Sequence, residues 1–213
     1  MTSSSAARAP KACAVAATRL AYTPAAMDAG SSDEELMMRF AAGDAAAFDA
    51  LYARHRGGVF RYLLRQCQNR ATAEELFQDV WMNLMHARGR YRVQAKFATF
   101  LYTLAHNRLI DHFRRHKRLR LVSLREEDSD PVELQASAAL EPERNAQARE
   151  QAARLLQLVT ELPDVQREVF LLHEEGELSL DAIAQVTGAN RETVKSRLRY
   201  AMDKLREGMK DYL

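Results

Sequence analysis

Residues 179–199 carry polar and cationic side chains at the spacing of two short helices that meet at Gly188. Ala184 is the small residue expected where such helices cross, and Val194 is placed to anchor the second helix. A glycine at the turn takes a positive φ at little cost. The second helix of such a pair can present its N-terminal residues to the major groove of DNA, so the pattern predicts a helix-turn-helix. The alternative is a plain helical hairpin.

A second stretch combines aromatic and cationic side chains. Asn107, Asp111, Arg114 and Arg118 recur at three- and four-residue spacing, so on a helix they share one polar face. Cations that follow phosphates, next to aromatic surfaces on which unpaired bases rest, are typical of single-strand capture. A core helix with a solvated basic end has the same composition, and the residues alone leave both interpretations open. The aromatic residues at the start of this stretch are Tyr91, Phe97, Phe100 and Tyr102.

A third candidate surface is acidic and polar. Glu75, Gln78, Asp79 and Asn83 repeat at helical spacing on the face opposite Trp81. Taken alone, this stripe is what any solvated helix face looks like.

The sequence offers little for catalysis or metal binding. His112 and His116 stand four residues apart, but they lack the adjacent glutamate of a zinc-protease helix and lie in an arginine cluster that repels cations. A glycine-rich phosphate loop and a nucleophile elbow are also missing from the sequence. We therefore expect no catalytic residue, no metal and no cofactor, and we do not expect an enzyme.

The composition favours an all-α protein in a reducing compartment. In 213 residues there are only 8 glycines and 5 prolines, among abundant helix formers. Lys and Arg total 31 against 29 Asp and Glu, so the net charge of +2 says nothing about partners. Cys13 and Cys67 have no metal-site spacing, and no apolar run is long enough to span a bilayer. We expect a cytoplasmic protein without membrane insertion.

Apolar residues at three- and four-residue spacing predict eight helices. Thr72, Asp164, Ser179 and Asn190 are the expected N-caps of four of them, and Gly57-Gly58 is a candidate break in the second helix. The predicted helices cover about residues 33–43, 48–70, 72–88, 97–118, 145–162, 164–176, 179–187 and 190–206.

These helices divide into two small domains. Residues 121–144 are acidic, contain two prolines and show weak apolar periodicity, which predicts a flexible linker. We expect one domain over residues 31–120 and a second, helix-turn-helix (winged-helix-like) domain over residues 145–213. Residues 1–30 are rich in Ala and Ser and predict a disordered extension. Their apolar stretch is too short for a secretory signal.

Four segments together resemble one protein family. They are EELFQDVW (residues 74–81), FATFLYTLAHNRLIDHFRR (97–115), Leu162-Pro163 and TVKSRL (193–198). In this order, and separated by an acidic linker, they resemble the extracytoplasmic-function (ECF) sigma factors of bacterial RNA polymerase, from about residue 33 to 205. The chain departs from the family pattern at Phe100, where a Trp is usual.

The resemblance implies a transcription initiation factor with three functional surfaces. The first domain, sigma region 2, would bind core RNA polymerase and the minus 10 promoter element. The second, sigma region 4, would bind the minus 35 element. An anti-sigma factor is the further expected partner. The implied core-binding residues are Glu75, Gln78, Asp79 and Asn83. The implied minus 10 residues are Tyr91, Lys96, Phe97, Thr99, Asn107, Arg114, Arg115 and Arg118. The implied minus 35 residues are Arg191, Glu192, Thr193, Lys195, Ser196, Arg197 and Arg199.

Two other classes of protein also fit these residues. One is a regulator that binds duplex DNA through residues 179–206 without polymerase, and it leaves the acidic stripe and the aromatic-basic stretch without a role. The other is an RNA-binding or antitermination module that uses the cationic cluster at residues 114–118.

Overall fold

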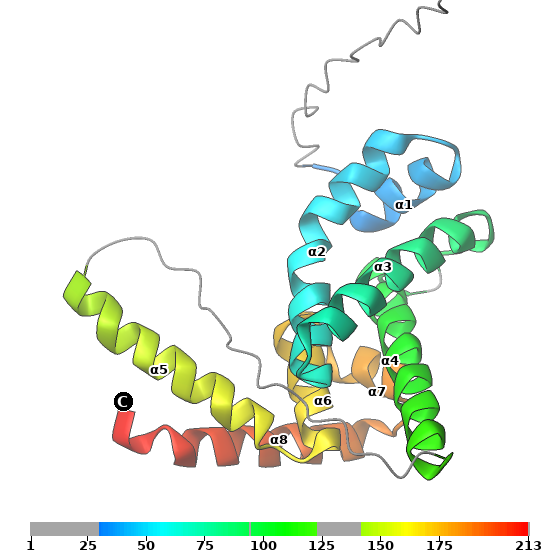
Figure 1. Ribbon diagram of the computed structural model, residues 1–213. Coiled ribbons are helices and arrows are strands. Elements are labelled where there is room, and N and C mark those ends of the chain that lie inside the picture. The colour runs from blue at the N-terminus through cyan, green and yellow to red at the C-terminus, as the bar shows by residue number, and fades with distance from the viewer. Residues whose placement is uncertain (1–29, 94, 123–141, 213) are drawn as a thin grey trace, which may run out of the picture.

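The computed structural model describes residues 30–93, 95–122 and 142–212, with side chains described except at 118–122, 142–147 and 211. In this part of the chain every regular element is a helix, which confirms the all-α prediction (Figure 1). The elements are α1 (Asp33–Ala41), α2 (Ala45–Cys67), α3 (Arg70–Ala87), the short 3-10 helix η1 (Arg88–Arg90), α4 (Phe97–Val122), α5 (Pro142–Thr160), α6 (Asp164–Glu174), α7 (Leu180–Thr187), α8 (Arg191–Gly208) and the 3-10 helix η2 (Lys210–Tyr212).

The first half begins with well-capped helices. Ser32 and Glu35 form a reciprocal capping box on α1, and the Asp44 carboxylate accepts hydrogen bonds from the backbone at the start of α2. The cap of α3 is Asn69, whose side chain accepts from the Thr72 amide at 2.9 Å. The prediction of Thr72 as the cap was therefore wrong by one turn.

An aromatic cluster holds α2 and α3 together, and Phe40 of α1 joins it through the Phe48 ring, with centroids 5.0 Å apart. Trp81 is 4% exposed and contacts the rings of Phe48, Tyr52 and Phe77, with ring centroids 4.8–6.0 Å apart. Aromatic pairs at these distances add to the stability that apolar burial alone supplies. The predicted break at Gly57-Gly58 is absent, and α2 continues through both glycines.

The second half contains the predicted helix-turn-helix. Ser179 caps α7, Gly188 ends it with φ of 67°, and Asn190 caps α8. Val194 of α8 is fully buried in the core, as expected for the residue that anchors the second helix. Asp164 is not a cap. It forms an ion pair with the buried Arg167 instead.

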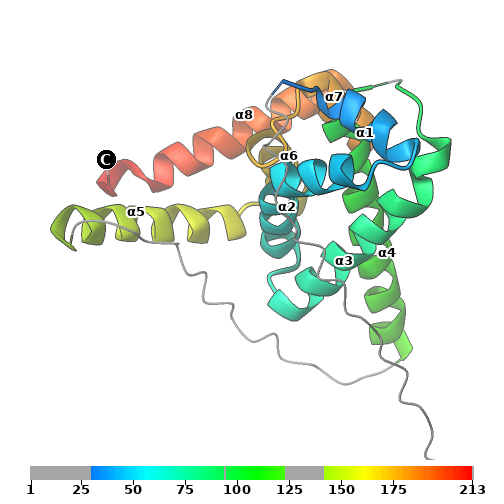
Figure 2. The same cartoon turned by 90° about the horizontal axis from the view of Figure 1, so that it is seen from above.

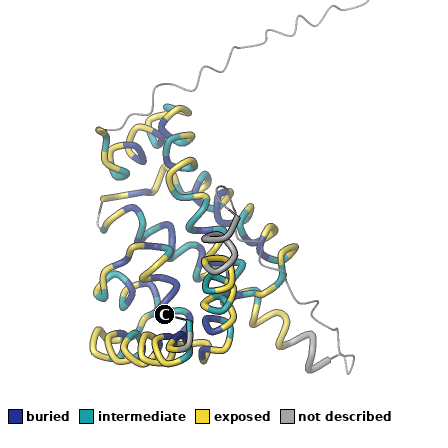
Figure 3. Tube along the Cα trace, turned by 90° about the vertical axis from the view of Figure 1, so that its left-hand side faces the viewer, coloured by how far each residue is buried: buried dark blue, intermediate teal, exposed yellow. Residues whose placement is uncertain are grey.

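Helix α5 and the C-terminal part of α8 lie against each other and project away from the first half of the protein, whereas α8 also packs against α6 and α7 (Figures 1 and 2). Gly208 lets them approach closely, because a Cβ at this position would lie only 2.4 Å from a methyl group of Leu158. Buried residues gather where the helices face one another (Figure 3). None of the described helices is long and apolar enough to cross a membrane.

The two halves also contact each other directly. Helix α7 packs against α4, and α6 packs against α2. The helices extend into both ends of the expected linker, since α4 ends at Val122 and α5 begins at Pro142. The remainder of that linker, and the expected N-terminal extension up to residue 29, lie outside the described residues.

Candidate nucleic-acid interface

The N-terminal half of α8 presents a polar face to solvent. The Asn190 side chain accepts a hydrogen bond from the Thr193 amide at 2.7 Å, which fixes where the helix begins. Thr193 and Arg197 are half-buried, whereas the other expected contacts are exposed. These exposed residues are Arg191, Glu192, Lys195, Ser196 and Arg199.

The charges on this face are partly ordered before any ligand binds. Arg191 pairs with Asp181 of α7 at 3.0 Å and with Glu192 at 3.5 Å. Among the described residues, Lys195 has no ion-pair partner, and the Arg199 guanidinium lies 5.1 Å from the centre of the Tyr200 ring. Such exposed cations can bind phosphates without first giving up a strong partner.

Helix α4 carries the second polar face. Asn107, Asp111, Arg114 and Arg115 are exposed along it, and Lys96 is exposed in the loop before it. Arg118 belongs to α4, but its side chain lies outside the described residues. The face therefore offers amide, carboxylate and guanidinium groups to a partner along several turns of helix.

Three residues expected to contact DNA are buried instead. Phe97 is fully buried, Thr99 is 3% exposed and Tyr91 is 5% exposed. The Phe97 ring packs near His55, with centroids 5.2 Å apart, and the Tyr91 ring packs on Phe100 at 5.3 Å. Phe97, Thr99 and Tyr91 are therefore core residues in this conformation and are not free to hold a base.

The buried residues instead position the loop that precedes α4. The Phe97 amide donates to Glu34 Oε1 at 2.7 Å, which ties the start of α4 to α1. Burial raises the pKa of Tyr91, and the nearby carboxylates of Glu34 and Asp33 raise it further. Tyr91 therefore stays neutral and anchors one end of the loop, while Lys96 remains exposed at the other.

The polar face of α3 is partly used within the protein. Glu75 and Gln78 are exposed and Asn83 is half-buried. Asp79 is not a free acid, because its carboxylate forms an ion pair with Arg108 of α4. Sequence spacing did not reveal this partner, which lies 29 residues away, and the role of Asp79 in docking stays a prediction.

Met82 is a member of this α3 surface that the sequence reasoning missed. Its side chain is 47% exposed, one helical turn after Gln78. The sequence does contain a signal for it, because Met82 is an apolar residue at the helical spacing of the polar stripe. A flexible, polarizable thioether exposed among polar side chains is typical of a protein-binding site.

The described part of the chain contains no cluster of three or more His, Cys, Asp or Glu side chains suited to a metal. The ring centroids of His112 and His116 lie 4.2 Å apart. Partial burial lowers the pKa of His112, and the neighbouring His116 lowers it further. The Cys67 thiol donates to the Leu63 carbonyl, and burial raises its pKa to about 12. This thiol therefore stays protonated and is a poor nucleophile.

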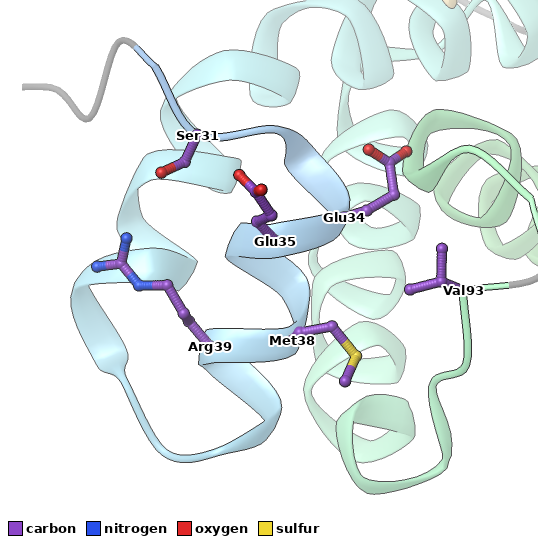
Figure 4. A pocket seen from close by; sticks show the side chains of 6 residues that line it. All are labelled: Ser31, Glu34, Glu35, Met38, Arg39 and Val93. Carbon is purple, nitrogen blue, oxygen red and sulfur yellow. The ribbon is translucent and has the colours of Figure 1, made fainter.

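A hollow lies between α1 and the loop before α4 (Figure 4). Met38 and Val93 supply its apolar lining, with Glu34, Glu35 and Arg39 around them. Three acids occupy the first turn of α1, which makes this hollow unfavourable for a phosphate group. It is separate from the cationic face of α4.

Comparisons with known proteins agree with this arrangement. Residues 51–119 match sigma-70 region 2, and residues 152–205 match sigma-70 region 4. The two matches coincide with the halves that carry the α3–α4 surfaces and the helix-turn-helix. Together they define a sigma-70-type transcription initiation factor.

Relatives in several bacteria show to which subfamily of sigma factors the chain belongs. The sigma factor CarQ of Myxococcus xanthus is 30% identical over 171 residues, covering 80% of this chain and 94% of CarQ. The ECF sigma factor SigK of Mycolicibacterium vanbaalenii is 30% identical, covering 90% of this chain and 93% of SigK. The ECF sigma factor BldN of Streptomyces coelicolor is 32% identical and is matched over 64% of its length. The chain belongs to the ECF sigma factors of bacterial RNA polymerase.

Solved structures share the fold. The sigma factor RpoE of Bartonella quintana, in complex with the anti-sigma factor NepR, superposes with a TM-score of 0.63 at 19% identity, covering 76% of this chain and 96% of that one. CnrH, in complex with the cytosolic domain of CnrY, gives a TM-score of 0.58 at 22% identity, covering 83% and 96%.

Proposed function

We propose that this sigma factor reads promoters through two separate surfaces. The exposed face of α8 binds the minus 35 duplex, with its cations on phosphates and guanine edges. The face of α4, together with Lys96, captures the unpaired minus 10 strand. The observation that carries the proposal is that the two faces lie in different halves of the chain, and that each exposes cationic or amide side chains.

The minus 10 set is smaller than the sequence predicted. It consists of Lys96, Asn107, Arg114 and Arg115, with Arg118 as an extension along the same helix. An Asn side chain offers both a donor and an acceptor, so Asn107 can distinguish base edges. The cations hold the backbone. Tyr91 and Phe97 act by fixing the loop and the start of α4, and Thr99 is buried beneath them in the core.

Promoter melting follows from differential binding. A chain that holds the unpaired strand better than the duplex shifts the equilibrium towards the open promoter. Unstacking costs on the order of a few kcal/mol, and the contacts to the captured strand offset this cost. Nucleotidyl transfer belongs to the polymerase, and the sigma chain supplies no catalytic group or cofactor.

The polar face of α3 is the proposed dock for the core enzyme. Met82 lies on the same face as Glu75, Gln78 and Asn83, which gives the face an exposed apolar side chain beside polar ones. Asp79 contributes through its ion pair with Arg108, which links this surface to α4. The chain acts in the cytoplasm, where it would meet the polymerase.

An anti-sigma factor is a further proposed partner. The RpoE structure that shares this fold is of a complex with the anti-sigma factor NepR. A partner of that class would control access to the surfaces of α3, α4 and α8.

Transcription from a randomised promoter library tests the proposal. Core polymerase is mixed with the chain, and the transcript starts are sequenced. We expect starts downstream of two motifs at one preferred separation. A single duplex motif, selected equally well without core enzyme and yielding no transcripts, would instead support an independent DNA-binding regulator.

A further inference from the structure

One arginine at the start of α8 lies between two carboxylates. Arg191 is the first residue of this helix. Its Nε lies 3.0 Å from Asp181 Oδ1, in the first turn of α7, and its Nη1 donates to Glu192 Oε1 at 3.5 Å. Two of the three guanidinium nitrogens therefore have an acidic neighbour, one from each helix of the helix-turn-helix. We call Asp181 and Glu192 the carboxylate bracket of Arg191.

The bracket lies on the surface of the protein. The side chains of Arg191, Asp181 and Glu192 are 52%, 76% and 74% exposed. Ion pairs between exposed side chains contribute little to the free energy of unfolding, since water screens the charges and the side chains lose freedom. The bracket can therefore be removed without unfolding the second half of the protein, and its main effect is on what the surface binds.

The guanidinium keeps donors for a ligand. It carries five N–H groups, of which the bracket engages one at Nε and one at Nη1. The donors that remain include one on Nη1 and both on Nη2, and two neighbouring donors of this kind form the fork that matches O6 and N7 of guanine. The first residues of a recognition helix are also those that contact base edges in the major groove. Arg191 thus has the position and the donors to read a guanine.

The same bracket makes Arg191 a poor phosphate contact. A phosphate bound to the guanidinium would lie about 4 Å from its charge, and each carboxylate lies about 4 Å on another side, so no more than about 8 Å from the phosphate. Because Coulomb energy falls as the inverse of distance, two like charges at about 8 Å cancel one opposite charge at about 4 Å, and at shorter distances they outweigh it. A guanine edge has no net charge and escapes this repulsion.

The other cations of this face lack such a bracket. Lys195, one helical turn after Arg191, is exposed and has no described ion-pair partner, and the Arg199 guanidinium lies over the Tyr200 ring. Either side chain can meet a phosphate without repulsion from a bound carboxylate. The charges of the face therefore favour a division between one base reader and two backbone contacts.

We propose that Arg191 reads a guanine of the minus 35 duplex and that Asp181 is a positioning residue that keeps its guanidinium off the phosphates. This inference rests on the minus 35 surface proposed above. Glu192 belongs to the same helix as Arg191, whereas Asp181 holds the side chain from α7. Lys195 and Arg199 then carry the phosphate contacts of this face.

Replacing single guanines by 7-deazaguanine tests the reader. This base pairs normally but lacks the N7 acceptor. Core polymerase with the full chain is titrated against a promoter selected from the library, in which each guanine of the minus 35 element is replaced in turn. At one position the parent should bind at least about fivefold more weakly, and in Arg191→Ala the same replacement should cost less than about twofold.

Asp181→Ala tests the positioning role. It should reduce the 7-deazaguanine penalty to less than about twofold, because Arg191 is no longer held at the base. With one acid removed, Arg191 can take a phosphate, so the slope of log affinity against log salt should steepen by up to about 0.9. Asp181→Glu keeps the carboxylate and should keep the penalty.

Asp203→Ala is the matched control. Asp203 is an exposed acid of α8 that pairs with Arg206 at 2.9 Å, and it lies about 18 Å along the helix from Arg191. The substitution changes the net charge as Asp181→Ala does, and it should alter neither the penalty nor the salt slope. Far-ultraviolet circular dichroism should be the same for all variants, because only exposed side chains change.

An equal penalty in the parent and in Arg191→Ala, or no sensitive guanine in the parent, would overturn Arg191 as the reader. An unchanged penalty and salt slope in Asp181→Ala would overturn the positioning role of Asp181. Scrambling the minus 35 element tests the proposed function separately. If the parent does not depend on that element, the minus 35 surface fails as well, whereas dependence on the element without a penalty linked to Arg191 overturns this inference alone.

Discussion

Reversing the charge of Asp79 tests the two roles that its carboxylate has in this account. Its side chain is 37% exposed and its partner Arg108 is 26% exposed, so the pair is neither fully solvated nor buried. Loss of such a pair costs about 1 kcal/mol. In Asp79→Arg, two like charges about 4 Å apart would repel by about 4 kcal/mol at an effective dielectric constant near 20, before the side chains rotate apart. We expect the free energy of unfolding to fall by about 2–3 kcal/mol.

A charge swap separates folding from docking. In Asp79→Arg combined with Arg108→Asp, the ion pair is restored with opposite polarity, so most of the lost stability should return. The α3 surface still carries a reversed charge at position 79. Affinity for core polymerase should therefore stay at least tenfold below that of the parent. Glu75→Arg, at an exposed position without a described ion pair, should lower core affinity with less than about 0.5 kcal/mol change in stability.

Urea unfolding followed by circular dichroism gives the stability, and titration of a fluorescently labelled chain with core enzyme gives the affinity. If the charge swap restores core affinity together with stability, Asp79 acts only through the fold. If Glu75→Arg also binds core normally, the polar face of α3 is not the docking surface.

Three further substitutions probe the DNA-binding surfaces and the core beneath them. Asn107→Ala should leave stability within about 0.5 kcal/mol of the parent but reduce transcription about 5- to 160-fold, because a lost base-edge contact costs about 1–3 kcal/mol. Part of the defect should persist on a template with a pre-melted minus 10 bubble, and normal transcription on both templates would make Asn107 an ordinary surface residue. Lys195→Ala should lower the slope of log affinity against log salt by about 0.9 for duplex minus 35 DNA, and an unchanged slope would place Lys195 away from phosphate. Phe97→Ala should lower the free energy of unfolding by about 3–5 kcal/mol, because the ring is fully buried. If Phe97→Ala is as stable as the parent and fails only in strand capture, Phe97 contacts the DNA and is not a core residue.

The helices and the helix-turn-helix were predictable because their signals are local. Ser179 and Asn190 are caps whose oxygen atoms accept from backbone amides three residues on, and Gly188 takes the positive φ that ends α7. Apolar periodicity also identified most of the core. The cap of α3 was misplaced because both Asn69 and Thr72 suit a cap, and sequence alone does not choose between them.

The candidate site was less predictable because burial and pairing are tertiary properties. An aromatic residue near cations fits base stacking and core packing equally, and the structure places Phe97 and Tyr91 in the core. Asp79 was expected to be exposed, and its partner Arg108 lies on a different helix. The contacts of Glu175 with α2 lie more than 100 residues apart in sequence, beyond the reach of any local pattern.

Permanganate footprinting on a promoter selected from the library tests the central claim most directly, because it detects unpaired thymines. Core polymerase with the parent chain should produce reactive thymines around the minus 10 element, together with protection of the minus 35 duplex. Core alone and the chain alone should produce no reactive thymines, and Asn107→Ala with core should produce weaker reactivity at unchanged minus 35 protection. Protection of a duplex site by the chain alone, with no opening when core is added, would contradict promoter melting by strand capture.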